Sequence, residues 1–153
     1  MVLTIAFCIG IIAGLRALTA PTLVSWAARL SILPLGATSL AFLGYHWTPW
    51  IFSLLALGEI INDKLPATPS RKVPPQFITR VITGSFSGAA ITLAHGSAVT
   101  GIIAGALGAV VGTLGGAELR GRLAKAAGRD FPIALLEDSV AVFGGILLIR
   151  LLL

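Results

Sequence analysis

The fold of this chain is decided by a long stretch without charge, residues 81–117. It reads VITGSFSGAAITLAHGSAVTGIIAGALGAVVGTLGGA and contains no Asp, Glu, Lys or Arg. The stretch is long enough for two membrane helices of about 17–20 residues each. His95-Gly96-Ser97 supplies a turn between them. The stretch therefore predicts a helical hairpin that crosses a membrane twice.

The composition of the whole chain points to the same class of protein. Of the 153 residues, 56% are hydrophobic and only 11% are charged, and the mean hydropathy is +0.98. Soluble domains carry roughly a quarter charged residues, and a small soluble domain cannot cover its apolar surface with so few. We therefore expect a single polytopic transmembrane domain over residues 1–153, partnered by the lipid bilayer.

The expected fold is an all-α integral membrane protein with about five transmembrane helices. Their ranges are 2–27, 49–64, 77–94, 98–118 and 131–152. The first span contains Pro21, where we expect it to kink or break; it is otherwise a span followed by an interfacial helix. Between the first two spans, prolines, glycines and the aromatic residues Tyr45, Trp47 and Trp50 favour an excursion along the membrane surface.

Basic residues lie mainly in two connecting loops, and these predict the orientation. The first holds Lys64, Arg71, Lys72 and Arg80, and the second holds Arg120, Arg122, Lys125 and Arg129. With five spans both loops lie on one face, which the positive-inside rule assigns to the cytoplasm. We expect a multi-pass protein of the inner (cytoplasmic) membrane with a cytoplasmic N-terminus. The net charge of +5 does not indicate nucleic-acid binding, since no single basic patch forms.

Glycines recur at helical spacing in the fourth expected span. They are Gly101, Gly105, Gly108, Gly112 and Gly115, and a weaker stripe in the first span includes Gly10 and Gly14. Steps of four and three place residues on one helix face, and glycine stripes let membrane helices approach closely. The stripes predict helix packing, either within the bundle or in a homodimer. The alternative is a pathway lined by exposed backbone.

Each of these glycine helices is followed by a helix that carries an acidic residue, Glu59 in the second span and Glu137 in the fifth. Two such pairs separated by one span have opposite topology. This arrangement is typical of the inverted repeats of transporters. It predicts a two-helix repeat, spans one–two and four–five, around span three.

Six charged residues within or beside the spans need partners: Arg16, Glu59, Asp63, Arg80, Glu137 and Asp138. A carboxylate near the centre of a membrane helix costs about 2.5–3.5 kcal/mol on insertion scales. Arg16 lies far from either end of its span, and its planar guanidinium can hold two carboxylates. Arg80 is a second cation for the same cluster. The cluster either locks the helices together, forms a polar path for an ion, proton or small solute, or provides a catalytic acid pair.

Motifs for enzymatic chemistry are missing from the sequence. Two distant histidines and one cysteine do not make a zinc cluster, and no G-x-S-x-G, P-loop or H-E-x-x-H motif occurs. We expect no metal, no cofactor and no enzymatic activity. The proline-rich loop with Lys64, Arg71 and Lys72 is either a solvated linker or a basic hook for lipid phosphates.

Four motifs together resemble a known family. They are GLRALTAP (14–21), LALGEIINDKLPATPSR (55–71), GALGAVVGTLGG (105–116) and ALLEDSVAV (134–142). In this order they are similar to the bacterial membrane family called domain of unknown function 4126, over nearly the whole chain. The resemblance implies a small multi-helix membrane protein and names no activity. The matching positions are Arg16, Glu59, Asp63, Lys64, Pro66, Pro69, Arg71, Glu137 and Asp138.

Two functions follow as expectations. The first is a transporter or channel, acting as a homodimer, for an ion, proton or small solute that uses the Arg/carboxylate cluster within the membrane. The second is a structural or lipid-binding membrane protein whose buried charges only hold the helices together. An intramembrane enzyme acting on a lipid has no motif in its favour.

Overall fold

A computed structural model describes residues 1–63 and 72–152 of the chain. These residues form six α-helices and one short 3-10 helix, with no strand among them, so the all-helical prediction is confirmed. The elements are α1 Val2–Leu15, α2 Thr19–Arg29, η1 Ala41–Gly44, α3 Thr48–Asn62, α4 Pro74–Leu93, α5 Ala98–Ala127 and α6 Phe131–Arg150.

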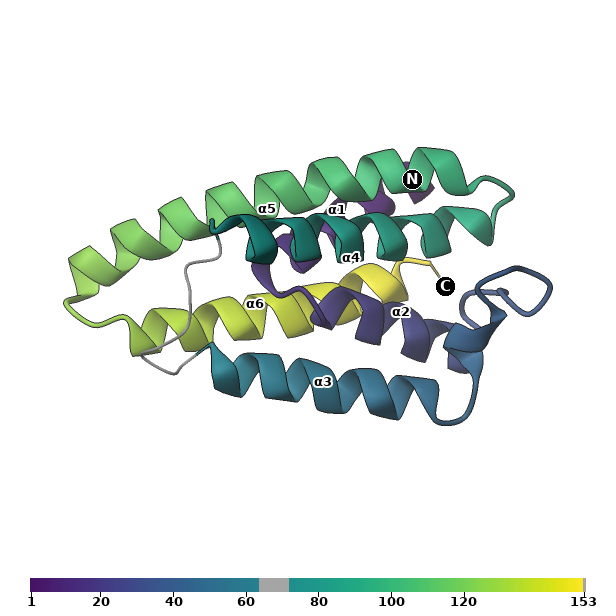
Figure 1. The fold of residues 1–153 in the computed structure, drawn as a ribbon, viewed down its shortest axis with the longest axis horizontal. Coiled ribbons are helices and arrows are strands. Elements are labelled where there is room, and N and C mark those ends of the chain that lie inside the picture. Colours follow the sequence, from purple (N-terminus) through teal and green to yellow (C-terminus); the bar gives the residue numbers. More distant parts are fainter. Residues whose placement is uncertain (64–71, 153) are drawn as a thin grey trace.

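Successive helices run in alternating directions along the long axis of the molecule (Figure 1). This includes α1 and α2, because the chain turns back between them. The labelled N- and C-termini therefore lie toward the same end of the bundle. Five crossings would separate the termini, so the arrangement differs from the one expected.

The first expected span, residues 2–27, is not one helix. It breaks at Arg16, whose backbone is extended with φ −141 and ψ 110, and not at Pro21 as expected. Pro21 lies in the first turn of α2, where the missing N–H of a proline costs no intrahelical hydrogen bond. The break has another cause, which lies in side chains from three other helices and is described below.

The remaining helices begin close to the expected positions, and prolines in the first turns of α3, α4 and α6 mark these starts. The end of α5 was predicted wrongly. It continues to Ala127 and stops at Gly128, which has the left-handed φ of 67 that ends many helices. The second basic loop is thus largely helical, since its Leu, Arg, Lys and Ala residues are good helix formers.

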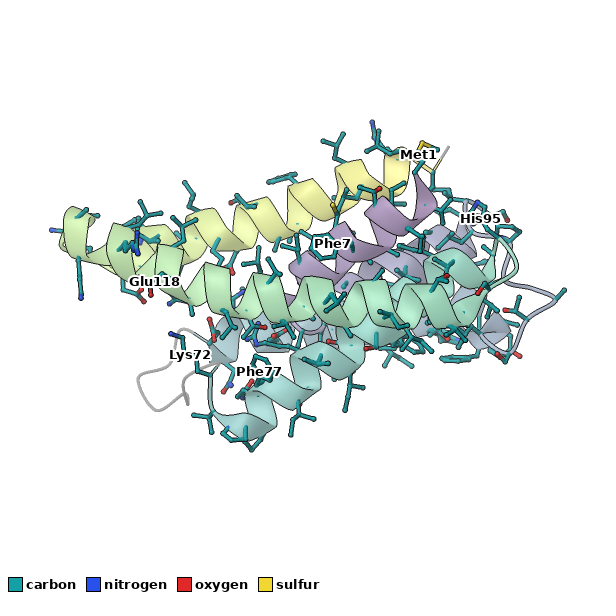
Figure 2. All side chains as sticks on the ribbon, turned by 90° about the horizontal axis from the view of Figure 1, so that it is seen from above. Met1, Phe7, Lys72, Phe77, His95 and Glu118 are labelled. Atoms are coloured by element: carbon teal, nitrogen blue, oxygen red, sulfur yellow. The ribbon has the colours of Figure 1, made fainter. Side chains whose placement is uncertain are left out.

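Two of the described helices, α5 and α6, are long and apolar enough to cross a membrane. The helices α1 and α3 are apolar but shorter. Large apolar side chains also point outward from the bundle, as the sticks in Figure 2 show; Leu54 and Phe143 are each 70% exposed. Exposed apolar side chains that gather in patches mark surfaces that contact a membrane or another protein.

The helices α1, α4 and α5 pack most closely, and glycines form their contact. A Cβ atom at Gly105 would overlap the carbonyl oxygen of Gly84 on α4. The same holds for the other close pairs, which are Gly101 with Gly88, Gly108 with Phe7, Gly112 with Ile11, Gly10 with Gly105 and Gly14 with Ala109. Gly115 differs, because a Cβ there meets nothing within 4 Å. The glycine faces thus pack inside one chain, with α5 against both α1 and α4, which also contact each other.

Candidate functional site

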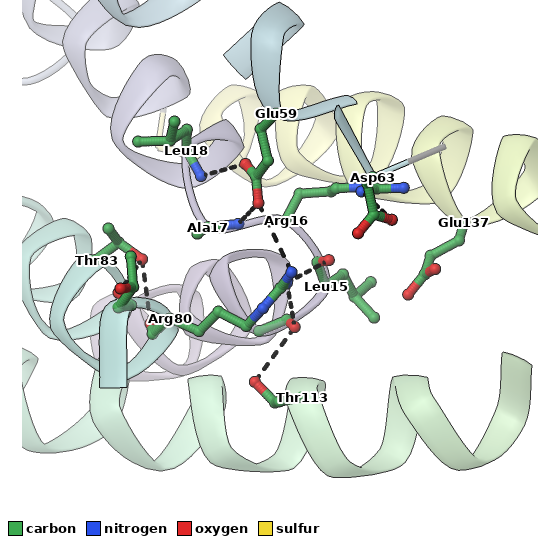
Figure 3. A network of polar contacts seen from close by, with 12 residues as sticks. Leu15, Arg16, Ala17, Leu18, Glu59, Asp63, Arg80, Thr83, Thr113 and Glu137 are labelled. Atoms are coloured by element: carbon green, nitrogen blue, oxygen red, sulfur yellow. Dashed lines mark hydrogen bonds and ion pairs between the residues drawn. The ribbon is translucent and has the colours of Figure 1, made fainter. Parts of the chain in front are cut away.

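The α2 helix begins on a carboxylate from α3. The backbone N–H groups of Ala17 and Leu18 donate to Glu59 Oε1 and Oε2, each at 2.8 Å. The first N–H groups of a helix have no partner within the helix, and the helix dipole favours a negative charge at this end. Glu59 therefore caps α2 with charge as well as with hydrogen bonds (Figure 3).

The α1 helix ends on a guanidinium from α4. Arg80 Nη1 donates to the carbonyl oxygens of Gly14 at 3.0 Å and Leu15 at 2.6 Å. Thr113 Oγ1 from α5 adds a longer contact to Gly14 O at 3.3 Å. Arg80 is only 2% exposed, and a positive charge is favourable at the C-terminal end of a helix. The two ends of the broken helix are thus capped by opposite charges.

These two caps also meet each other. Arg80 Nη2 lies 3.7 Å from Glu59 Oε1, so one ion pair bridges the end of α1 and the start of α2. An unpaired buried N–H or C=O group costs about 1–3 kcal/mol. The break between the helices is stable because Arg80 and Glu59 satisfy the groups that it exposes.

Arg16 occupies the extended residue between the two helices, and its side chain is fully buried. Its Nη1 lies 2.6 Å from Asp63 Oδ2 at the end of α3. Its Nη2 lies 2.5 Å from Asp138 Oδ1 on α6. One guanidinium therefore joins the junction to two further helices, as the sequence led us to expect of Arg16.

Arg120 extends the network to the end of α5. Its Nη1 contacts Asp63 Oδ2 at 3.2 Å and Glu137 Oε2 at 3.4 Å. Its Nε and Nη2 donate to both oxygens of Asp130, at 2.9 and 2.6 Å. Arg120 thus donates a two-pronged, charge-assisted hydrogen bond to Asp130.

The six charged residues expected to form a polar core lie in two ion-pair clusters at the junction of α1 and α2. One cluster pairs Glu59 with Arg80, and the other joins Arg16 to Asp63 and Asp138 and, through Arg120, to Glu137. The neighbours Glu137 and Asp138 point to different cations, Arg120 and Arg16. Neighbouring residues on a helix differ by about 100° in direction, which accounts for the division.

Sequence reasoning missed two members, Arg120 and Asp130, because both were assigned to a solvated loop. One signal was available, since Gly112, Gly116 and Arg120 follow one another at steps of four, which continues the glycine face of α5. Of the three basic residues expected to contact lipid phosphates, Lys72 is exposed. The other two, Lys64 and Arg71, lie outside the described residues.

A small pocket of about 90 Å³ opens beside the network, between α5 and α6. Its lining is apolar apart from Arg120 and Glu137, and it includes Leu119 and Leu136. Within residues 1–63 and 72–152, no three His, Cys, Asp or Glu side chains are grouped to hold a metal ion. The chemistry that the site offers is therefore that of buried ion pairs and of helix ends.

Comparison with known proteins adds no assignment. No protein-family model, no curated protein and no solved structure matches the chain.

Proposed function

We propose that the protein is a small multi-spanning membrane transporter or channel for an ion, a proton or a small solute, working at the junction of α1 and α2. The observation that carries the proposal is the pair of broken helix ends, closed by Glu59 and Arg80 in the interior of the bundle. Discontinuous helices whose ends point at charged groups are typical of transporter binding sites.

In the proposed mechanism, the transported species exchanges with one of the charged contacts at the junction. A helix start favours anions and unwound carbonyls favour cations, so the junction offers both kinds of contact. Buried pairs are finely balanced, because the cost of removing charges from water offsets most of their attraction. A competing charge can therefore open such a contact.

The proposed arrangement in the membrane follows from helix lengths and directions. At 1.5 Å per residue, α2 with its 11 residues is about 17 Å long, roughly half of a hydrocarbon core of about 30 Å, and α1 runs antiparallel to it (Figure 1). We place α1 and α2 as a hairpin that enters and leaves the membrane on one side, with α3 to α6 crossing it. Non-helical backbone at membrane depth is tolerated where protein surrounds it.

The orientation proposed here replaces a cytoplasmic N-terminus. Lys72 and the basic end of α5 lie at the end of the bundle away from Met1 (Figure 2). The positive-inside rule assigns that end to the cytoplasm, and both termini then lie outside. The inner membrane, a homodimer and membership of the family called domain of unknown function 4126 remain parts of the proposal.

The alternative is a structural or lipid-binding protein, and one observation favours it. Each of the three guanidinium groups of the network contacts carboxylates or helix carbonyls of the same chain. Such a network can lock the helices together without moving a solute. Under this alternative the acidic residues contribute to stability and have no role in transport.

The test is flux of protons and cations, and separately of small anions, into liposomes that contain the purified protein. Wild type is compared with Glu59→Gln and Glu137→Gln, and with Glu118→Gln as a control, because Glu118 pairs with Arg122 on the exposed face of α5. Transport predicts flux that is lost in well-folded Glu59→Gln and kept in Glu118→Gln. Absence of flux for every species, with early melting of the first two variants, would establish the structural alternative.

A further inference from the structure

We propose that the start of α2 and the groove beside it form a binding site for a carboxylate anion with a short apolar tail. Glu59 fills the head of this site with its own carboxylate. The inference deepens the function proposed above by naming a substrate class. Its transport aspect rests on that function, whereas binding of the anion does not.

The surroundings of Glu59 are those of a carboxylate site. Two separate backbone donors reach its two oxygens, from Ala17 and Leu18. A guanidinium that is almost completely buried, Arg80, approaches the same group. Helix starts and arginine are the usual partners of bound anions. None of these donors requires that the carboxylate belong to the chain.

A second observation points to a ligand. Thr19, the first residue of α2, is 4% exposed, and within the described part of the chain its Oγ1 has no hydrogen-bond partner. A helical threonine usually donates to the carbonyl four residues earlier, as Thr22 does to Leu18 O at 2.7 Å. Thr19 is the first residue of α2, so the carbonyl four residues earlier, that of Leu15, lies in α1 beyond the extended Arg16. A buried hydroxyl is thus left over beside the two N–H donors.

The third observation is the space next to Thr19. A groove of about 240 Å³ runs between α2, α3 and α6. Apolar side chains dominate its wall, among them Leu23, Ala56, Ile60 and Val142. Thr19 and Ile60, the sequence neighbours of Leu18 and Glu59, line the groove, so it begins next to the head of the site. The cationic head and the apolar groove together fit an anion with a short hydrocarbon tail.

For such an anion to bind in the wild type, Glu59 must leave the N–H groups. Uptake of one proton by Glu59 removes its charge, and one anion then takes its place, so the net charge of the site is unchanged. The charged groups packed around this exchange are Arg16 in the junction, Arg80 from α4, Asp63 on α3, Asp138 from α6 and Arg120 from α5. The site thus takes up a proton and an anion together.

The experiment is a chemical rescue of Glu59→Ala. The thermal midpoint of the purified variant is measured with sodium acetate, butyrate or hexanoate, at constant ionic strength made up with sodium chloride. The site predicts that these carboxylates raise the midpoint, and that affinity increases about fourfold for each methylene buried, the factor that corresponds to about 0.8 kcal/mol. Chloride alone and hexanol, which lacks the carboxylate, should leave the midpoint unchanged.

Two matched variants test separately the binding of the ligand's carboxylate and the binding of its apolar tail. Glu137→Ala also removes a buried carboxylate beside an arginine, but one that lies away from a helix end, so no carboxylate should rescue it. Adding Ala56→Leu to Glu59→Ala should keep the effect of acetate and abolish the gain from longer chains. Equal rescue of Glu137→Ala, or no rescue of Glu59→Ala by any carboxylate, would overturn the proposal.

A measurement on the wild type covers the case in which Glu59→Ala does not fold. Hexanoate should stabilise the wild-type protein at pH 6 more than at pH 8, and Glu59→Gln should remove this pH dependence. Stabilisation that is absent at both pH values counts against the site. Stabilisation without any flux in liposomes counts against transport and leaves the binding site standing.

Discussion

Arg80 and Glu59 cap the end of α1 and the start of α2, and the two side chains lie 3.7 Å from each other. Arg80 binds the last carbonyls of α1, and Glu59 binds the N–H groups of Ala17 and Leu18, which directly precede α2. Each side chain therefore has two partners, a helix end and an opposite charge. The interruption between α1 and α2 is stabilised by tertiary contacts and not by the local sequence.

Replacing Glu59 by glutamine should lower the free energy of unfolding by about 1.5–3 kcal/mol, the usual contribution of hydrogen bonds to a charged group. Chemical unfolding in mixed detergent measures the change. Glu118→Gln is the control: Arg122 hydrogen-bonds to this exposed carboxylate and lowers its pKa, so the same negative charge is removed at neutral pH. No measurable loss is expected there, and an equal loss in both variants would exclude capping of α2 as the cause.

Replacing Arg16 by alanine should destabilise the protein by about 3–5 kcal/mol, because the buried Asp138 and the partly buried Asp63 lose their shared guanidinium. Asp138→Asn, added to Arg16→Ala, should restore part of the loss, since one of the repelling charges is gone. A double-mutant cycle on these two positions measures the coupling. Strictly additive effects would mean that the 2.5 Å contact between the two side chains contributes nothing.

Replacing Gly105 by alanine should cost about 1–3 kcal/mol, because the new methyl group overlaps the carbonyl oxygen of Gly84 and the helices must separate. Gly115→Ala is the matched control in the same helix. A Cβ there meets nothing, and alanine is the better helix former by about 0.5–1 kcal/mol. It should be neutral or stabilising. Thermal unfolding of both variants compares them directly.

The proposed topology predicts which cysteines react with a maleimide that does not cross membranes. In a Cys8→Ser background, cysteines inserted after Met1 or placed at Leu151 should react in intact cells. A cysteine at Lys125 should react only after the cells are opened. Five crossings predict instead that the two ends of the chain react differently. The labelling pattern therefore decides between a re-entrant hairpin and a first transmembrane span.

The sequence predicted the helical class, most helix starts and the charged residues that need partners, because each of these depends on local patterns. It did not predict the break at Arg16. The pattern of α1 and α2 reads as one continuous apolar segment, and the groups that interrupt it, Arg80 and Glu59, come from distant parts of the chain. Arg120 was missed for a related reason, since the end of α5 was predicted at residue 118 and the helix continues to Ala127.

The acidic residues that pair with Arg16 could not be predicted either. The sequence offered several acidic residues for Arg16, and the structure selects Asp63 and Asp138. That choice depends on the direction of each side chain around its helix, and an error of one residue in a boundary changes the direction by about 100°.

The caps at the end of α1 and the start of α2 also determine when these two helices are completed during synthesis. The segments α1 and α2 leave the ribosome before α3, which supplies Glu59, and before α4, which supplies Arg80. The start of α2 lacks its cap until residue 59 has been made, and the end of α1 lacks its cap until residue 80 has been made; the glycine contacts of α1 with α5 come later still. The earliest helices are thus completed by segments translated after them, so the nascent hairpin must be sheltered from lipid, by the insertion machinery or by water, while it waits.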